Sequence, residues 1–458
     1  MSFVNRGPNG RAVIVGGLRT PFLKSGTEFR HLSGLELAKS CVVEMLQRLN
    51  LAPEDVDRVV FGQVVPSVQA PNVARELVLG TGMHRSVDAF SVTRACATGT
   101  QAIVDASMAI LLGDADVVVA GGTDSLSRPP ITVSQGLADA LMEANAAKEP
   151  LAKARAFLDV KAKDLIPVPP AIAELSTGET MGESAEKMAK ANGIAREEQD
   201  RLALASHQKA AAAWEKGIYA DEVMPFHVGP GFDQTVEKDG LVRSDTSLEK
   251  LGSLRPVFDR RHGSVTAGNA SPLTDGAAAV VLMSEEKAKS LGYEPKAFVR
   301  SWAFAALDPS WQLLMGPAFA SPVALERAGL AVSDLGFVDM HEAFAAQVAS
   351  NLDAFGSASW AKERLGREDA IGEIDETRFN LFGGSIALGH PFAATGARQA
   401  LTVANELGRR GDGTALIAQC AAGGLGAALV LERRRKKNDH DDGPKCRART
   451  RELSFLNL

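Results

Sequence analysis

Cysteine is scarce in this chain, and long apolar runs are missing. Only four of the 458 residues are cysteine, and they form no short-spaced pairs. This spacing argues against a disulfide framework and favours a reducing compartment. Because no apolar run approaches the ~20 residues of a membrane span, we expect a soluble protein.

Address and phosphate-binding signals are missing as well. The start, MSFVNRGPNGRAVIVGG, has neither the apolar core of a secretory signal nor the Arg/Ser-rich character of a transit segment, and the end, SFLNL, is not a peroxisomal address. We therefore expect a cytoplasmic protein. The glycine-rich loops hold no Gly-Lys-Ser/Thr sequence and no complete GxGxxG, which argues against a phosphate cradle.

The net charge of −6 is unevenly spread. Residues 433–458 contain nine Lys/Arg and four acids, so this tail carries +5 and the rest of the chain −11. The negative body argues against general nucleic-acid binding. The tail has no apolar periodicity and is predicted to be disordered, with contact to an acidic surface as the alternative.

The body alternates strands with helices. In the first part, RAVIVGG, VDRVVFGQVV and ADVVVAGG are typical of buried strands, and GLELAKSCVVEMLQRL is an amphipathic helix. A similar succession returns later, with KAFVRSWAF, GFVDM, FNLFGG and GTALIAQC as strands and helices at 317–329, 342–355 and 393–408. This pattern predicts an α/β fold of two homologous halves, with parallel strand pairing and helices on both faces.

The segment between the halves has a different texture, because helical pieces alternate there with proline breaks. We interpret it as an inserted, mostly helical loop domain that forms one wall of a cleft. The predicted division is an N-terminal half (1–124), the inserted domain (125–263), a C-terminal half (264–432) and the basic tail (433–458).

Cys96 lies where the predicted strand at 88–92 gives way to a helix. Unpaired N–H groups and the macrodipole at a helix start favour a thiolate, so we expect a lowered pKa for this thiol. A nucleophile is one interpretation. A small buried hydrophobe is the other, because most free cysteines are of that kind.

Three more residues with chemical potential lie in the second half. Cys420 ends the strand GTALIAQC, at a carboxyl strand end where open α/β sheets place their sites. His390 lies in the loop GGSIALGHPFAATG, and His341 directly follows GFVDM. If the halves pack about a pseudo-twofold axis, these loops converge, although a single histidine ordinarily only satisfies a loop carbonyl.

Two cysteines and two histidines in such loops allow two interpretations. One is a Cys₂His₂ zinc site, against which the lack of closely spaced ligand pairs argues. The other, which we favour, is covalent chemistry on a thioester or carbonyl. In it a thiolate attacks, a histidine activates it, N–H donors hold the oxyanion and the second cysteine moves a proton.

Five ordered motifs carry a family resemblance: VTRACATGTQAI, GNASPLTDGAAAVVL, HEAFAAQ, GGSIALGHPFAATGAR and CAAGGLGAALVLER. Together they resemble the thiolase family over about Arg11 to Arg433. HEAFA and the long insert around PVPPAI resemble the degradative 3-ketoacyl-CoA thiolases, the β-subunit type of fatty-acid β-oxidation multienzyme complexes. The resemblance implies a thiolase-like fold with a five-layer α/β/α/β/α core.

The resemblance also assigns roles. Cys96 is the acylated nucleophile, and its own backbone N–H contributes to an oxyanion hole. His390 takes the thiol proton and later donates an N–H to an oxyanion, while Cys420 is the acid/base. Ser271 lies near the pantetheine of CoA and Arg243 near its nucleotide end, and Met181 and Met315 line the acyl pocket. Arg243 as an ordinary surface residue and the methionines as core filler stay open as alternatives.

Two positions depart from the family pattern. Most thiolases have Asn where this chain has His341, and that Asn holds a water in the oxyanion hole. A histidine can hold that water or donate directly. The usual Cys-x-Gly reads Cys420-Ala421-Ala422 here. Because alanine adopts a glycine-only φ only at a cost, we rely on Cys420 more than on the N–H of Ala422.

The implied activity is cleavage of 3-ketoacyl-CoA by CoA into acetyl-CoA and a shortened acyl-CoA, the last step of β-oxidation, by a ping-pong covalent mechanism. The thioester enolate accepts the electron pair, so no metal or other cofactor is needed, and CoA is a substrate. The alternatives are a biosynthetic acetoacetyl-CoA-forming thiolase and a non-catalytic lipid-binding relative. Expected partners are a second copy, as a homodimer or dimer of dimers, a multifunctional hydratase/dehydrogenase subunit and a peripheral membrane contact.

Overall fold

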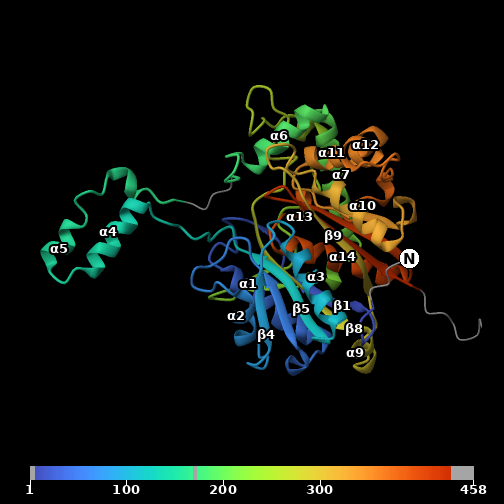
Figure 1. Cartoon of the computed structure of the whole chain (residues 1–458), viewed down its shortest axis with the longest axis horizontal. Coiled ribbons are helices and arrows are strands. Elements are labelled where there is room, and N and C mark those ends of the chain that lie inside the picture. Colours follow the sequence, from blue (N-terminus) through green and yellow to red (C-terminus); the bar gives the residue numbers. More distant parts are fainter. Residues whose placement is uncertain (1–5, 169–172, 435–458) are drawn as a thin grey trace, which may run out of the picture.

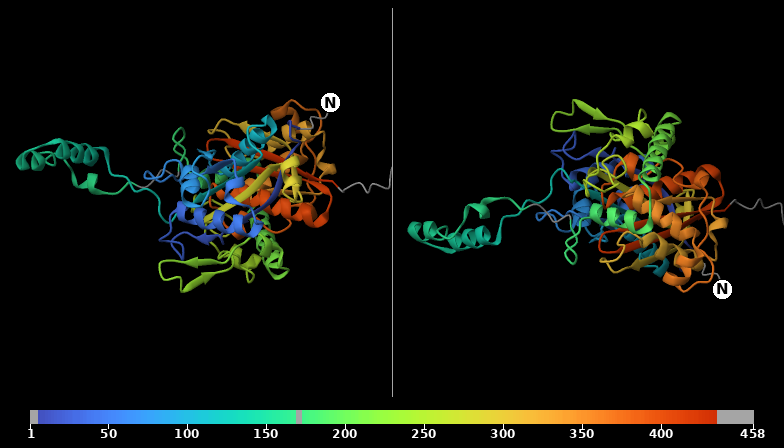
Figure 2. Two further views of the ribbon diagram at one scale, coloured as in Figure 1. Left: turned by 90° about the horizontal axis from the view of Figure 1, so that it is seen from below. Right: turned by 90° about the horizontal axis from the view of Figure 1, so that it is seen from above.

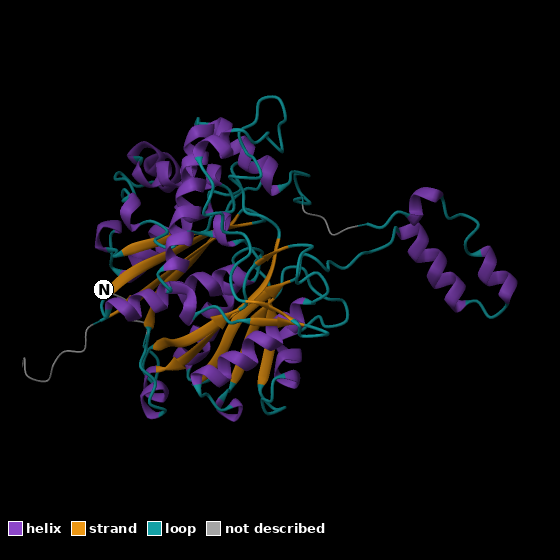
Figure 3. Ribbon diagram, turned by 180° about the vertical axis from the view of Figure 1, so that it is seen from behind, coloured by secondary structure: helices purple, strands orange, loops and turns teal. Residues whose placement is uncertain are grey.

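The computed structural model describes residues 6–168 and 173–434; all of the basic tail but its first two residues lies outside these ranges. The strands of the body form one continuous ten-stranded sheet, whose two parts are called here the first and the second sheet, with helices between and outside these parts (Figures 1 and 3). The strands of the first sheet, in spatial order, are β4 (Asp88–Val92), β3 (Arg58–Gly62), β5 (Val117–Asp124), β8 (Thr274–Ser284) and β1 (Ala12–Arg19). The second sheet follows as β9 (Ala297–Ala306), β12 (Leu425–Arg433), β11 (Gly413–Ala421) and β10 (Phe337–Met340). The short β2 (Leu23–Lys24) pairs with β8.

The two sheets repeat one strand order. β3 pairs parallel with β5, and β10 pairs parallel with β11. β5 then pairs antiparallel with β8, and β11 antiparallel with β12. β1 and β9 are the last strands of the two repeats. They pair with each other, antiparallel, through Val13–Phe298 and Ile14–Ala297. The sheets are therefore mixed, and not purely parallel as expected, because β8 and β12 run antiparallel to the strands beside them.

Two expectations about the second half need correction. The boundary at residue 264 does not follow the strands, because β8 belongs to the first sheet, between β1 and β5. FNLFGG forms no strand. A single parallel bridge from Val338 to Phe379 stands where β4 lies in the first half. The next residue, Asn380, has φ +41° and turns the chain away, and its side-chain amide bonds to the backbone of Met340 instead.

The helices form three layers around the sheets, which confirms the five-layer core. α3 (Thr98–Leu112) and α14 (Ala394–Arg410) lie between the sheets and pack on each other. α1 (Gly34–Leu49) and α2 (Val73–Gly80) cover the outer face of the first sheet. α10 (Gly316–Ala328) covers the second sheet, with α11 (Ala345–Gly356) beside it. The remaining body helices are α9 (Glu285–Ser290), α12 (Ala358–Leu365) and α13 (Ser385–Leu388).

The two central helices touch through glycine. A Cβ on Gly99 of α3 would stand 2.6 Å from the backbone nitrogen of Ala397, and one on Gly396 of α14 would stand 2.4 Å from that of Thr100. Residues 95–112 are long and apolar enough to cross a membrane by composition, but 61% of that stretch is buried inside the fold. α3 is thus a core helix that packs on the first sheet and on α14, and α14 contacts the strands of both sheets.

The insert has two parts. α6 (Met181–Asn192), α7 (Arg196–Glu215), α8 (Leu248–Gly252) and the hairpin β6 (Phe226–Val228) to β7 (Gln234–Val236) lie against the body. α4 (Gln135–Ala146) and α5 (Pro150–Arg155) instead project from it as an arm (Figures 1 and 2). Buried Arg19 of β1 connects the first part of the insert to the body. Its guanidinium bonds both carboxylate oxygens of Asp239, at 2.6 and 2.8 Å, and Glu222 at 3.1 Å.

Candidate active site

Cys96 lies on a tight turn between β4 and α3. The preceding residue, Ala95, has φ +44°, an uncommon conformation for a residue with a Cβ. The hydroxyl of Thr98 secures the turn, because it accepts the N–H of Arg94 at 2.8 Å and donates to the carbonyl of Ala95 at 2.7 Å. The turn presents a half-buried thiol beside the start of α3. Strained backbone of this kind is typical of functional positions.

Loops of the second half reach this thiol. His341 follows β10, and His390 precedes α14. The sulfur of Cys96 and one ring nitrogen of each histidine all lie within 4.8 Å of one another. The two imidazole centroids are 4.2 Å apart. Cys420, near the end of β11, is buried; desolvation raises the pKa of its thiol well above the usual value, and its electrostatic interaction with Cys96 raises that pKa further. The structure therefore brings Cys96, His341 and His390 together. Cys420 directly precedes Ala421, and Ala421 belongs to the small apolar cluster on which Cys96 packs.

The hydrogen bonds of His390 define its tautomer. Its Nδ1 lies 2.7 Å from the hydroxyl of Thr395, and that hydroxyl donates to the carbonyl of Pro391 at 3.0 Å. Since the hydroxyl has one proton, Nδ1–H of His390 must be the donor to Thr395. The lone pair is then on Nε2, which is buried and has no hydrogen-bond partner in the described chain. Nε2 of His390 is thus available as a base.

His341 is held in a similar way. Its Nδ1 lies 2.9 Å from the hydroxyl of Ser385, and its backbone N–H donates to the carbonyl of Ala418 at 2.8 Å. Its Nε2 is likewise buried, with no partner among the residues that the structure describes. When Ser385 donates to Nδ1, Nε2 carries the proton and can donate to an oxyanion directly.

Burial controls the protonation of the site. Desolvation, with the positive charge of Arg398, lowers the pKa of His390 to about 3. Desolvation, His390 and Arg398 lower the pKa of His341 well below its usual value. Both imidazoles are therefore neutral near pH 7.

The expected lowering of the Cys96 pKa was wrong. Desolvation raises the pKa of this thiol to about 11 and outweighs the hydrogen bonds from the N–H of Ala422 and its own N–H. The helix N-terminus lies two residues further on, at Thr98, which limits its effect. At rest, Cys96 is thus a protonated thiol beside the neutral imidazole of His390. The thiol proton must therefore leave Cys96 when its sulfur attacks.

The doubt about Ala422 was also misplaced. Ala422 has no positive φ; the left-handed positions of this turn are Gly423, at +82°, and Gly424, at +68°. The N–H of Ala422 reaches the sulfur of Cys96. Alanine here therefore keeps its N–H donor without backbone strain.

The residues predicted to contact CoA and the acyl chain lie at different depths in the protein. The N–H of Ser271 donates to the carbonyl of Ala343 at 2.9 Å, and Leu273 forms a bridge with His390, so this loop runs past both histidines. Met181 and Met315 begin α6 and α10 and pack in the apolar cluster that includes Cys420. Arg243 is exposed, and its backbone N–H bonds the ring of His207 at 3.2 Å.

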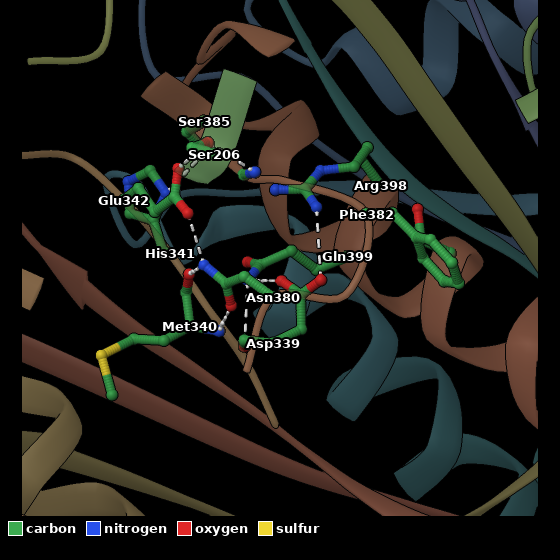
Figure 4. Close-up of polar contacts among 12 residues, drawn as sticks. Ser206, Asp339, Met340, His341, Glu342, Asn380, Phe382, Ser385, Arg398 and Gln399 are labelled. Carbon is green, nitrogen blue, oxygen red and sulfur yellow. Dashed lines mark hydrogen bonds and ion pairs between the residues drawn. The ribbon is translucent and has the colours of Figure 1, made fainter. Parts of the chain in front are cut away.

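Sequence reasoning missed the support behind His341. The buried carboxylate of Glu342 accepts the Ser206 hydroxyl at 2.6 Å and the Asn380 side-chain amide at 2.6 Å (Figure 4). It also accepts the N–H of Ile386 at 3.3 Å. A Cβ on Gly384 would lie 2.3 Å from this carboxyl group. Glu342 therefore fastens the loop that carries Ser385.

A second support lies behind His390. Arg398 of α14 is almost fully buried and lies 3.6 Å from a carboxylate oxygen of Asp339, which also accepts the Gln399 amide at 2.6 Å (Figure 4). Glu342 and Arg398 both occur in the motifs HEAFAAQ and GGSIALGHPFAATGAR. The spacing of those motifs nevertheless carries no sign of the partners that the residues bind.

Fold and site together define a class: two α/β halves that bring a half-buried thiol and two buried, neutral imidazoles together. Two family models match the chain, the thiolase N-terminal domain over residues 12–286 and the thiolase C-terminal domain over residues 293–433. The chain belongs to the thiolase family.

Individual relatives are similar over nearly the whole length. The chain is 53% identical over 422 residues to the 3-ketoacyl-CoA thiolase of Yersinia enterocolitica, which covers 92% of this chain and 97% of that protein. The acetyl-CoA acetyltransferase of Bacillus anthracis superposes with a TM-score of 0.79 at 32% identity, over 93% of this chain and 99% of that one. Human mitochondrial 3-ketoacyl-CoA thiolase in complex with CoA gives 0.77 at 30%, over 94% and 99%.

Proposed function

We propose that this protein is a 3-ketoacyl-CoA thiolase that cleaves 3-ketoacyl-CoA with CoA. One observation carries the proposal: the Cys96 thiol lies beside the unpartnered lone pair of a neutral His390, within a site that also holds Cys420. The 53% identity to a 3-ketoacyl-CoA thiolase supports the same activity.

The first half-reaction acylates Cys96. Its sulfur attacks the C3 carbonyl while the proton passes to Nε2 of His390, and the new oxyanion accepts N–H donors. The C2–C3 bond then breaks, and its electron pair moves into the thioester as an enolate. Cys420 protonates C2, so acetyl-CoA leaves and the shortened acyl group remains on Cys96.

The second half-reaction restores the thiol. The Cys420 thiolate takes the proton of incoming CoA, whose sulfur attacks the acyl-Cys96 thioester. His341 and His390 donate Nε2–H to the second oxyanion. Cys96 then leaves as a thiolate and takes back the proton that Nε2 of His390 received in the first half-reaction. Each step uses side chains of this protein, so the mechanism needs no metal or other cofactor. Ser271 and Arg243 contact CoA, and Met181 and Met315 line the acyl cavity.

The activity is tested by thiolysis of 3-ketoacyl-CoA substrates of increasing chain length, with intact-mass detection of the acyl adduct. We expect an adduct on Cys96 and higher kcat/KM for medium or long chains than for acetoacetyl-CoA. A rate confined to the four-carbon substrate would favour the biosynthetic alternative, in line with the similarity to an acetyl-CoA acetyltransferase. Absence of both adduct and thiolysis would overturn the proposal.

The arm supports a further part of the proposal, association with a hydratase/dehydrogenase subunit or a membrane surface. α4 packs on α5 and on the turn Ala162–Leu165, yet much of the arm's apolar surface is uncovered. Met142 is 73% exposed and Leu158 78% exposed; Ile131, Leu141, Leu151, Leu165 and Ile166 are exposed as well. An uncovered apolar surface of this extent, on a projecting element, is typical of an interaction site.

Replacing Gln135–Lys163 by a Gly/Ser linker tests this part. We expect weaker copurification with the partner subunit and weaker vesicle binding, with thiolysis of a short substrate unchanged. A milder variant, Met142→Ser with Leu158→Ser, should act in the same direction. Its matched control is Leu112→Ser, at an exposed leucine of α3 that is 73% exposed. Normal association of the shortened protein would assign the arm to another task.

A further inference from the structure

The three side chains at the centre of the site form an arrangement of metal ligands. The sulfur of Cys96 and a ring nitrogen of His341 and of His390 lie within 4.8 Å of one another. They come from three separate loops, so no ligand spacing in the sequence predicts this group. Cys420 is not in this group, so the arrangement differs from the Cys₂His₂ site that the sequence left open.

A second observation points to a ligand. The Nε2 atoms of His341 and His390 are buried and have no hydrogen-bond partner in the described part of the chain. Buried polar atoms are almost always satisfied, so two unsatisfied imidazole nitrogens on rings whose centroids are 4.2 Å apart indicate a bound group. His390 presents a lone pair there, and His341 does so when its Nδ1–H donates to Ser385.

The outer contacts are also those of metal-binding histidines. Metal-ligating imidazoles usually use one nitrogen for the metal and the other for an orienting hydrogen bond. Here Nδ1 of His390 bonds Thr395 at 2.7 Å, and Nδ1 of His341 bonds Ser385 at 2.9 Å. Both rings are thus held through Nδ1, which leaves both Nε2 atoms for an ion, and the thiol of Cys96 is the least buried of the three groups.

The distances require only a small closure. Bonds of about 2.0–2.3 Å in tetrahedral geometry place neighbouring N and S ligands roughly 3.3–3.6 Å apart. Closing the difference requires side-chain rotation, and Cys96 has the most room for it because it is the least buried of the three. Thiolate and imidazole ligands select zinc and similar soft or borderline cations over Mg²⁺ or Ca²⁺. The nearby charge of Arg398 opposes a cation, but its ion pair with Asp339 offsets that charge.

We propose that Cys96, His341 and His390 form an inhibitory binding site for Zn²⁺ and related thiophilic divalent cations. The ion replaces the proton of the Cys96 thiol, which is released to water, and bonds to Nε2 of both histidines, leaving a fourth position for water. The bound ion occupies the nucleophile and its base, so it competes with acylation. The inhibition rests on the proposed function, whereas the binding does not.

Cobalt provides a direct probe. The full-length protein, freed of metal and carrying Cys446→Ser to remove the tail cysteine, is titrated with Co²⁺. We expect one ion per chain, with a thiolate-to-cobalt absorption band in the near ultraviolet that added Zn²⁺ abolishes. Cys96→Ser should lose the band, and His341→Asn should weaken binding at least about tenfold, since an amide is a poor ligand for these ions. Circular dichroism verifies that the variants are folded.

The control is His84→Asn, which removes an exposed histidine far from this group in the sequence. It should leave the cobalt affinity unchanged, and Zn²⁺ should inhibit thiolysis by the parent protein reversibly, with EDTA restoring the rate. The proposal is overturned if cobalt binding persists unchanged in Cys96→Ser, if it weakens in His84→Asn, or if the parent binds no stoichiometric ion. If the protein binds cobalt through Cys96 but has no thiolysis activity, the proposed function fails and the metal site stands.

Discussion

The two halves of this protein have the same strands but use the ends of those strands differently. Gly62 of β3 pairs with Gly122, two residues before Asp124, and Met340 of β10 pairs with Ala418, two residues before Cys420. Asp124 and Cys420 therefore occupy equivalent positions. Asp124 is engaged structurally, because it accepts the N–H groups of Val64, Val65 and Ala393 at 2.7–3.0 Å. Cys420 is a free thiol beside Cys96.

The central helices show the same divergence. Gly99 and Gly396 each contact the other helix, so Cys96 and Ala393, three residues before them, are equivalent. Ala393 has no reactive group, and the base of the second half is His390, three residues earlier. In the proposed mechanism, one half thus supplies the nucleophile, and the other supplies the groups that transfer protons. A repeated scaffold leaves its loops free to diverge, because the core depends on the strands and helices rather than on the loops.

The largest effect is expected at the nucleophile of the first half. Cys96→Ser should abolish thiolysis and acyl labelling and leave the melting temperature nearly unchanged, because a hydroxyl has no anionic form near neutral pH. Intact-mass spectrometry after mixing with a 3-ketoacyl-CoA checks this. An adduct that persists in the variant, or that maps to Cys420, would reverse the assignment of the two cysteines.

Cys420→Ala probes the equivalent strand end in the second half. The variant should still acylate Cys96, but thiolysis and exchange of the α-protons of acetyl-CoA should fall by roughly 10²–10⁴, the usual contribution of a general acid/base. Proton exchange is followed by NMR in deuterium oxide. Exchange at the normal rate would remove Cys420 from the mechanism.

A smaller loss is expected from Thr395→Val, which removes the acceptor of Nδ1–H of His390. Loss of one buried hydrogen bond costs about 1–3 kcal/mol, so the acylation rate should fall roughly 5- to 150-fold. Thr395→Ser keeps the hydroxyl and should stay near the parent rate in rapid-mixing assays. Equal losses in both variants would show that packing matters at Thr395, not the hydroxyl.

Asp124→Asn tests the structural member of the equivalent pair. An amide nitrogen cannot accept the N–H groups that the carboxylate holds, so we expect about 1–3 kcal/mol of lost stability, visible as a lower melting temperature. Activity at low temperature should stay within about tenfold, in contrast to Cys420→Ala. A loss of rate as large as that of the cysteine variant, at unchanged stability, would give Asp124 a chemical role.

The smallest effect should be that of pH on acylation. A histidine whose pKa is lowered to about 3 stays neutral until the pH falls close to that value, so lowering the pH from 8 to 5 should not remove the base. The acylation rate measured by stopped flow should therefore show no step near pH 6.5. A tenfold fall per pH unit below 6.5 would mean that His390 has an ordinary pKa.

The sequence by itself determined the α/β repeat and the family, and it predicted the three side chains that the structure brings together, Cys96, His341 and His390. Strand and helix patterns depend on local periodicity, which is how the helix at Gly34–Leu49 was predicted with its bounds as observed. The motifs around Cys96 and His390 are contiguous, so their chemistry could be recognised without a structure.

Tertiary structure decided what depends on distant partners. The mixed strand direction follows from β8 and β12, which run antiparallel to β5 and β11, and β8 also joins the first sheet from the later part of the chain. The raised pKa of Cys96 follows from desolvation, which no local motif reports. Likewise, Ser385, Thr395 and Glu342 acquire roles only because folding places them against the histidines and their loops. Pairing and burial join residues far apart in the chain, and such contacts have no period for a sequence pattern to reveal.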